Sequence, residues 1–328
     1  MSKQDFVLDV DNKLFSLVGK NCDFVWWKNL MADKDLYFDV RKHNKINVYH
    51  NGGSLMSLSM NAKEELVSEI SIKYVLFQKK LSKDSRIHFT FTENDSPSFG
   101  DSIELLPLPI KDFSSDVLNL YKERLREYNL DESEKGIQAK YVTDSLKSYG
   151  VDPIDGSKGL FIDSEFAYEV DKDNEGRVDL VWLQPIDVSK GHYKLFFVEL
   201  KRCTDSRLKK SSKKVGDKGY KEDIVKQLEK YKNSVTMYEN ELIEFYKKLM
   251  VIKNKLGIFD FEVKKLDLEL KPILLIGDCT EEWLNDKAVS LHDWVKSEGC
   301  AYGGVYQNFN EYNFNVPKND VDVCCSLF

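Results

Sequence analysis

Residues 176–183 read GRVDLVWL and residues 193–201 read YKLFFVELK, and these two apolar runs decide the fold around them. Each run has the length and the β-branched and aromatic content of a buried strand. Asp179 lies inside the first run, and Glu199 and Lys201 lie at the end of the second. Because burying an unpaired carboxylate is costly, we expect a cation or another partner opposite these residues.

Further predicted elements surround the two runs. The chain predicts helices at residues 115–128, 133–148 and 281–297, and strands at residues 165–170, 271–278 and 305–309. The strands between residues 165 and 201 follow one another closely, so we expect an antiparallel meander. The fold class is therefore α/β (α+β), with a central mixed sheet flanked by helices.

The first 95 residues predict a smaller N-terminal α+β domain. Its strands are expected at residues 36–40, 46–49, 54–58 and 86–91, and a helix at residues 62–81. Asn51-Gly52-Gly53 supplies a turn, because Asn and Gly tolerate positive φ. Residues 96–112 are proline-rich and predict a linker. The second domain then covers residues 113–328.

Residues 221–255 predict one long helix. Apolar residues alternate at spacings of four and three from Ile224 to Ile252, and neither Gly nor Pro interrupts them. This is a coiled-coil pattern. A helix packed on its own sheet explains the first half. For Val235–Ile252 we expect a helical hairpin, a homodimer contact or a partner protein.

Composition excludes several classes of protein and favours one kind of ligand. The chain has 328 residues, and its apolar runs are too short to cross a membrane, so we expect a cytoplasmic protein without a membrane contact. The six cysteines lack the spacing of a zinc site. The net charge is −7, but Lys201–Lys232 contains twelve basic and five acidic residues, a local net charge of +7. A phosphate backbone responds to such local charge.

The two strands place carboxylate chemistry together. Side chains two apart on a strand share a face, so Glu199 and Lys201 project together, and Asp179 lies within reach on the neighbouring strand. Two converging carboxylates repel each other unless a divalent cation lies between them. Mg²⁺ prefers oxygen ligands and activates bound water. The Lys201 ammonium adds a positive charge beside a phosphate.

Asp179 followed by Glu199-Leu200-Lys201 resembles the PD-(D/E)xK nuclease superfamily, and the order of elements resembles its helix–three strands–helix–strand core. Gln227 and Tyr231 are similar to the Q-x-x-x-Y element of the RecB-like branch. The resemblance implies a restriction-endonuclease-like core, Mg²⁺ held by Asp179, Glu199 and the Leu200 carbonyl, and Mn²⁺ as a substitute. It further implies that Lys201 is catalytic and that Gln227 and Tyr231 orient substrate or water.

The sequence also departs from that pattern. Val178 stands where many members have Pro, and the upstream helix acid has two candidates, Glu134 and Glu165. Two other E-x-K triplets, at residues 262–264 and 269–271, lack an Asp-bearing apolar strand before them. Each site residue alone also fits a purely structural role, so the prediction depends on their combination.

The predicted function is hydrolysis of phosphodiester bonds by an Mg²⁺-dependent nuclease, with DNA favoured over RNA. The alternative is a catalytically silent or gated binding module of the same fold, for nucleic acid or protein, assembled through the helix at residues 221–255. A role in defence or repair is suggested by the resemblance alone. The predicted contacts to the nucleic-acid backbone are Arg202, Arg207, Lys209, Lys210, Lys213 and Lys214.

Overall fold

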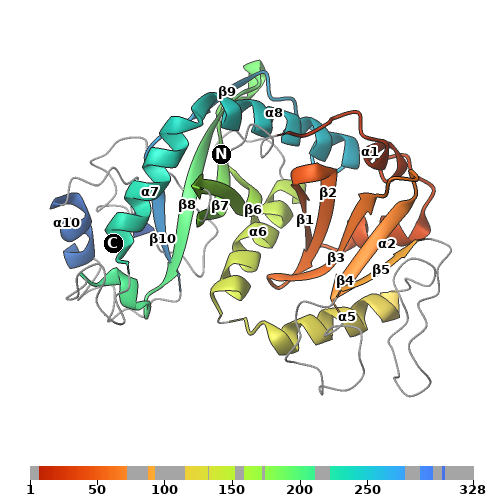
Figure 1. Cartoon of the computed structure of the whole chain (residues 1–328), viewed down its shortest axis with the longest axis horizontal. Coiled ribbons are helices and arrows are strands. Elements are labelled where there is room, and N and C mark those ends of the chain that lie inside the picture. The colour runs from red at the N-terminus through yellow and green to blue at the C-terminus, as the bar shows by residue number, and fades with distance from the viewer. Residues whose placement is uncertain are drawn as a thin grey trace. The chain divides into compact units, whose positions relative to one another are not determined.

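The computed structural model describes residues 7–71, 88–92, 115–131, 133–151, 159–171, 174–210, 222–277, 289–297 and 305–306. The chain forms two compact units (Figure 1). The N-terminal unit contains Phe6–Thr143 and Phe245–Glu262, and the C-terminal unit contains Asp144–Glu244 and Val263–Phe328. Each unit combines helices with one sheet, so the predicted mixture of α and β structure is confirmed.

The N-terminal unit is built on an antiparallel meander. Its strands follow in chain order: β1 (Leu36–Arg41), β2 (Lys45–His50), β3 (Gly53–Met60), β4 (Leu66–Ser71) and β5 (His88–Thr92). The turn between β2 and β3 has positive φ at Asn51 and Gly52, as its composition predicted. The predicted strands at 36–40, 46–49, 54–58 and 86–91 are confirmed where they are described.

The helix predicted at residues 62–81 is wrong for the part that the structure describes. Leu66–Ser71 is strand β4, which pairs with β3 and β5. Val67 and Ile70 are buried there. The helix-forming residues that precede them misled the prediction, because packing of β-branched side chains between two neighbouring strands outweighs local propensity.

Helices complete the core of the N-terminal unit. They are α1 (Lys13–Leu17), α2 (Val25–Ala32), α5 (Ser115–Tyr128), the first part of α6 (Glu134–Val151) and the end of α8 (Glu239–Leu256). The buried Lys122 of α5 contacts Asp33 at 2.9 Å and Asp35 at 3.0 Å. The unit therefore extends beyond the predicted boundary at residue 95. The predicted linker, residues 96–112, lies outside the described residues.

The C-terminal unit contains a mixed sheet in the order β11-β10-β8-β7-β6. Strands β6 (Leu160–Asp171), β7 (Asn174–Asp187) and β8 (His192–Arg202) form the predicted antiparallel meander. Strands β9 (Lys265–Leu268) and β10 (Ile273–Gly277) both pair in parallel with β8, and β11 (Val305–Tyr306) pairs with β10. Strand β9 was not predicted, because its four residues are too short for a recognisable pattern.

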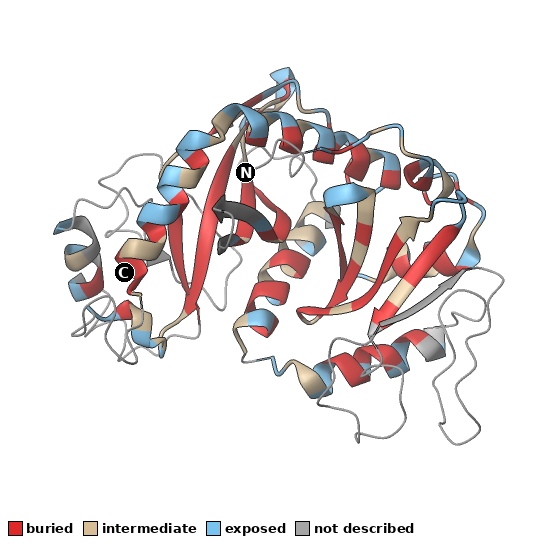
Figure 2. Ribbon diagram, in the orientation of Figure 1, coloured by how far each residue is buried: buried red, intermediate tan, exposed pale blue. Residues whose placement is uncertain are grey.

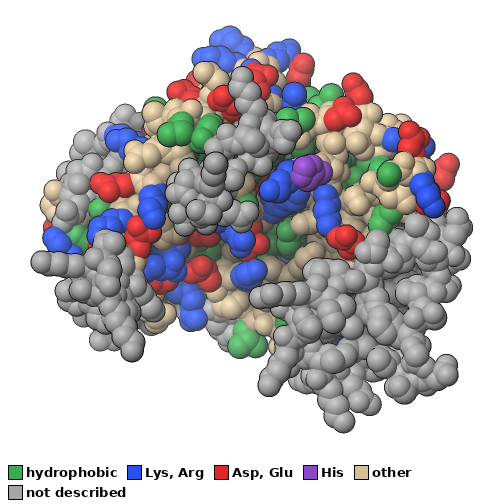
Figure 3. Space-filling model, in the orientation of Figure 1, with side chains coloured by type: hydrophobic (Ala, Val, Ile, Leu, Met, Phe, Trp, Pro, Cys, Tyr) green, Lys and Arg blue, Asp and Glu red, His purple; other side chains and the backbone are tan. Residues whose placement is uncertain are grey.

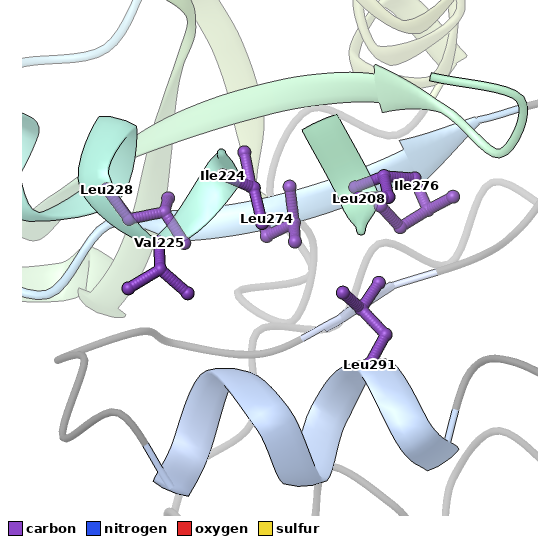
Figure 4. Packing of buried hydrophobic residues seen from close by; sticks show 7 residues of the cluster. All are labelled: Leu208, Ile224, Val225, Leu228, Leu274, Ile276 and Leu291. Carbon is purple, nitrogen blue, oxygen red and sulfur yellow. The ribbon is translucent and has the colours of Figure 1, made fainter. Parts of the chain in front are cut away.

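Two helices cover β10 in this unit. Helices α7 (Ile224–Met237) and α10 (Val289–Ser297) pack with the sheet through a cluster of buried aliphatic side chains (Figure 4). The cluster consists of Leu208, Ile224, Val225, Leu228, Leu274, Ile276 and Leu291. It fixes the start of α7 beside the end of β8, where Glu199 and Lys201 lie.

The single long helix predicted at residues 221–255 is wrong. Two helices, α7 and α8, meet at Tyr238, whose φ of −116° and ψ of 25° leave the helical range. The apolar seam is buried on both sides of this break, from Leu228 to Leu249 and Ile252 (Figure 2). Helix α7 and the start of α8 belong to the C-terminal unit, and α8 from Phe245 onward belongs to the N-terminal unit. The chain therefore buries the seam itself, without a second copy.

Candidate active site

Two neighbouring strands bring Asp179 and Glu199 together. Leu180 of β7 pairs with Val198 of β8, and the same register continued by one residue sets Asp179 opposite Glu199. The Leu200 amide donates a hydrogen bond to Asp179 Oδ2 at 2.9 Å. The site therefore forms where the hydrogen-bonded pairing of β7 and β8 ends. There the Asp179 side chain, and not a backbone carbonyl, accepts the hydrogen bond from β8.

The ammonium of Lys201 lies among the three groups that were predicted to bind Mg²⁺. It contacts the Glu199 carboxylate, donates to the Leu200 carbonyl at 2.7 Å and lies 3.5 Å from Asp179 Oδ2. Glu199 and Lys201 are 0% and 1% exposed. Their mutual attraction offsets part of the cost of burying two charges. The arrangement is a buried cation position surrounded by oxygen atoms.

The environment of Glu199 disfavours its ionised form, even though Lys201 lies beside it. Burial, followed by repulsion from Asp179, raises the pKa of Glu199 from 4.5 to about 8, against the opposing effect of Lys201. Glu199 Oε2 is also buried without a hydrogen-bond partner among the described residues. An unpartnered buried carboxylate oxygen beside a second carboxylate fits a divalent cation, which takes oxygen ligands.

Tyr231 of α7 makes a hydrogen bond at the site, whereas no hydrogen bond of the Gln227 side chain to the site is described. The buried Tyr231 hydroxyl donates to the backbone carbonyl of Arg177 on β7, and Tyr231 is also one of the groups that lower the pKa of Glu199. Gln227, one helical turn earlier, is half-buried, and the structure describes no hydrogen bond from its amide to another described residue.

Neither candidate for a third acid completes a metal cluster. Glu134 lies in the first turn of α6, in the part of that helix that belongs to the N-terminal unit. Glu165 lies on β6, where its neighbours Ser164 and Phe166 pair with Leu180 and Val178, so it is level with Asp179. Within the described ranges, no three Asp, Glu, His or Cys side chains form a group that could hold a metal.

The predicted basic contacts are only partly described. Arg202 and Arg207 are half-buried and Lys209 and Lys210 are exposed, whereas Lys213 and Lys214 lie outside the described residues. Arg207 pairs with Asp205 at 2.5 Å. On the described surface in Figure 3, Lys and Arg side chains are interspersed with Asp and Glu rather than gathered in one patch.

One other E-x-K triplet is described in enough detail to compare. Glu269 pairs with Lys194 of β8 at 2.5 Å and accepts a hydrogen bond from the Lys271 amide. Its contacts therefore stabilise the sheet locally. The comparison supports the choice of Glu199 and Lys201.

Sequence reasoning missed Arg177, which lies two residues before Asp179 on β7. The signal was available, because residues two apart on a strand share a face. The count of charges began at Lys201 and so passed over this residue.

No helix of the described residues is long and apolar enough to cross a membrane. Comparisons of the chain with protein-family models, with curated proteins and with solved structures found no match.

Proposed function

We propose that the protein is a Mg²⁺-dependent nuclease that hydrolyses phosphodiester bonds, with DNA favoured over RNA. The observation that carries the proposal is the convergence of Asp179, Glu199 and the Leu200 carbonyl on one buried cationic group. The unpartnered Glu199 Oε2 supports it further. A carboxylate pair with this burial has no evident structural purpose in a core, since an apolar pair would be less costly.

The order of the elements supports a restriction-endonuclease-like core. Helix α6, the meander β6–β7–β8 and helix α7 follow one another, and after α8 and β9 the chain forms β10, which pairs in parallel with β8. Apart from the additional α8 and β9, this is the helix–three strands–helix–strand order that the resemblance implies. We base the finer fold assignment on this order together with the site.

The residues of this site would divide the work as follows. Asp179, Glu199 and the Leu200 carbonyl would hold Mg²⁺ or Mn²⁺. The bound metal would supply an activated water and neutralise charge on the phosphate. Lys201 places its ammonium beside the same oxygens and would stabilise negative charge that develops on the phosphate. Tyr231 fixes the backbone of β7 next to Asp179.

The proposal is tested by cleavage assays on single- and double-stranded DNA and RNA with Mg²⁺ or Mn²⁺. Wild type is compared with Lys201→Ala, Asp179→Asn and the control Lys194→Ala. Lys194 lies on the same strand but pairs with Glu269. Metal-dependent cleavage that the first two variants lose and the control retains supports the nuclease. Equal cleavage by wild type and Lys201→Ala, or no cleavage of any substrate by folded, metal-loaded wild type, contradicts it.

A further inference from the structure

Arg177 is a further cation beside the carboxylate pair, on the strand that carries Asp179. It lies on β7 two residues before Asp179, so the two side chains share one face of the strand. Strands β7 and β8 are antiparallel, which puts Arg177 at the same end of the pair as Lys201. Two cations therefore lie at one end of the site.

The main chain of Arg177 is held firmly, whereas its side chain is not. The Tyr231 hydroxyl donates to the Arg177 carbonyl, and the next residue, Val178, is buried. The Arg177 side chain is 55% exposed. A guanidinium on a fixed backbone but open to solvent is placed to meet a ligand rather than to support the core.

The ion pair that the structure describes for Arg177 is weak. Its Nη1 lies 3.8 Å from Glu165 Oε1, whereas Arg207 holds Asp205 through several shorter contacts. An exposed pair of this kind contributes little to stability. Glu165 itself has a φ of 49°, a left-handed conformation that is unfavourable for a residue with a side chain. Exchanging Glu165 for another anion would therefore cost little.

We propose that Arg177 binds a phosphate of the nucleic-acid backbone next to the bond that is cleaved, and that Glu165 holds the guanidinium until the phosphate replaces it. The planar guanidinium matches two phosphate oxygens at once, which favours a backbone phosphate as the ligand. The inference rests on the proposed function, because that function supplies the substrate.

Binding of fluorescently labelled single- and double-stranded DNA and RNA, measured by anisotropy in EDTA over a range of salt concentrations, tests this without cleavage. Arg177→Gln should weaken binding on the order of tenfold. The slope of the logarithm of the association constant against the logarithm of the salt concentration should become less steep, by about the amount that one phosphate contact contributes. Arg177→Lys should keep the slope. Glu165→Gln should tighten binding several-fold. The control Lys190→Gln removes an exposed cation paired with Asp187 at 2.8 Å and should change neither quantity.

An unchanged salt slope in folded Arg177→Gln overturns the inference, as does weaker binding by Glu165→Gln. The two proposals fail in different ways. Loss of cleavage in Lys201→Ala with an unchanged slope in Arg177→Gln keeps the nuclease and removes the Arg177 contact. Cleavage that survives in Lys201→Ala, with the slope change present, keeps the contact and removes the catalytic assignment.

Discussion

The Nζ atom of Lys201 lies 2.7 Å from the carbonyl oxygen of Leu200 and also contacts Glu199. With Asp179 at 3.5 Å, these are the same three groups that would hold a divalent cation. Two cations cannot share one set of oxygens at close range without strong repulsion, because unit charges 4 Å apart interact by about 4 kcal/mol at an effective dielectric constant of 20. Binding of a metal by these three groups would therefore displace the Lys201 ammonium.

The first prediction follows from this competition. Lys201→Met should bind Mn²⁺ about tenfold more tightly or better than wild type, although it should not cleave, since 1.4 kcal/mol of relieved repulsion corresponds to tenfold. Isothermal titration calorimetry measures the affinity, and Lys194→Met is the matched control. Unchanged or weaker Mn²⁺ binding by Lys201→Met would mean that the ammonium and the metal occupy separate positions.

Tyr231 and Gln227 should differ in their effect on stability. Tyr231→Phe removes the hydrogen bond from the buried Tyr231 side chain to the Arg177 carbonyl and should lower the free energy of unfolding by about 1–2 kcal/mol. Gln227→Ala removes an amide without a described partner and should change it by less than about 0.5 kcal/mol. Urea denaturation of both variants checks the pair. Equal losses of stability would contradict the different roles of the two residues.

The strands of the site were predictable because their apolar runs are long. Each run also contains a charged residue, which is unusual in a buried strand. Glu199 and Lys201 could be grouped from the two-residue period of a strand, and Asp179 joined them because its strand was expected to pair with theirs. The break at Tyr238 could not be predicted, because no Gly or Pro marks it. The apolar spacing continues through the break, so its position is set by tertiary packing and not by a local signal. Strand β4 was missed for a similar reason, since its pairing with β3 and β5 is not local.

His50 should make the stability of the chain depend on pH. It is buried, its Nε2 has no partner among the described residues, and burial lowers the pKa of His50 from 6.5 to about 4, with Arg126 and Lys122 lowering it further and Asp35 opposing them. The unfolded chain binds this proton at higher pH than the folded chain does. This contribution to stability is therefore complete above pH 6.5 and is lost as the pH falls towards 4.

The loss should reach about 3 kcal/mol, at 1.36 kcal/mol per pKa unit. Urea denaturation of wild type and His50→Gln at several pH values between 4 and 7 measures it. The variant should show a shallower dependence in this range. Parallel curves for the two proteins would show that His50 titrates normally in the folded state.

The seam of α8 should act as core rather than as an interface. Leu249 is fully buried in the N-terminal unit, whereas Val251, two residues later on the same helix, is 46% exposed. Leu249→Ala should lower the free energy of unfolding by about 2–5 kcal/mol through loss of packing and a residual cavity. Val251→Ala should change it by less than about 0.5 kcal/mol. Light scattering of the folded proteins should give the same mass for wild type and both variants. A lower mass for Leu249→Ala at unchanged stability would show that the seam joins two copies of the chain.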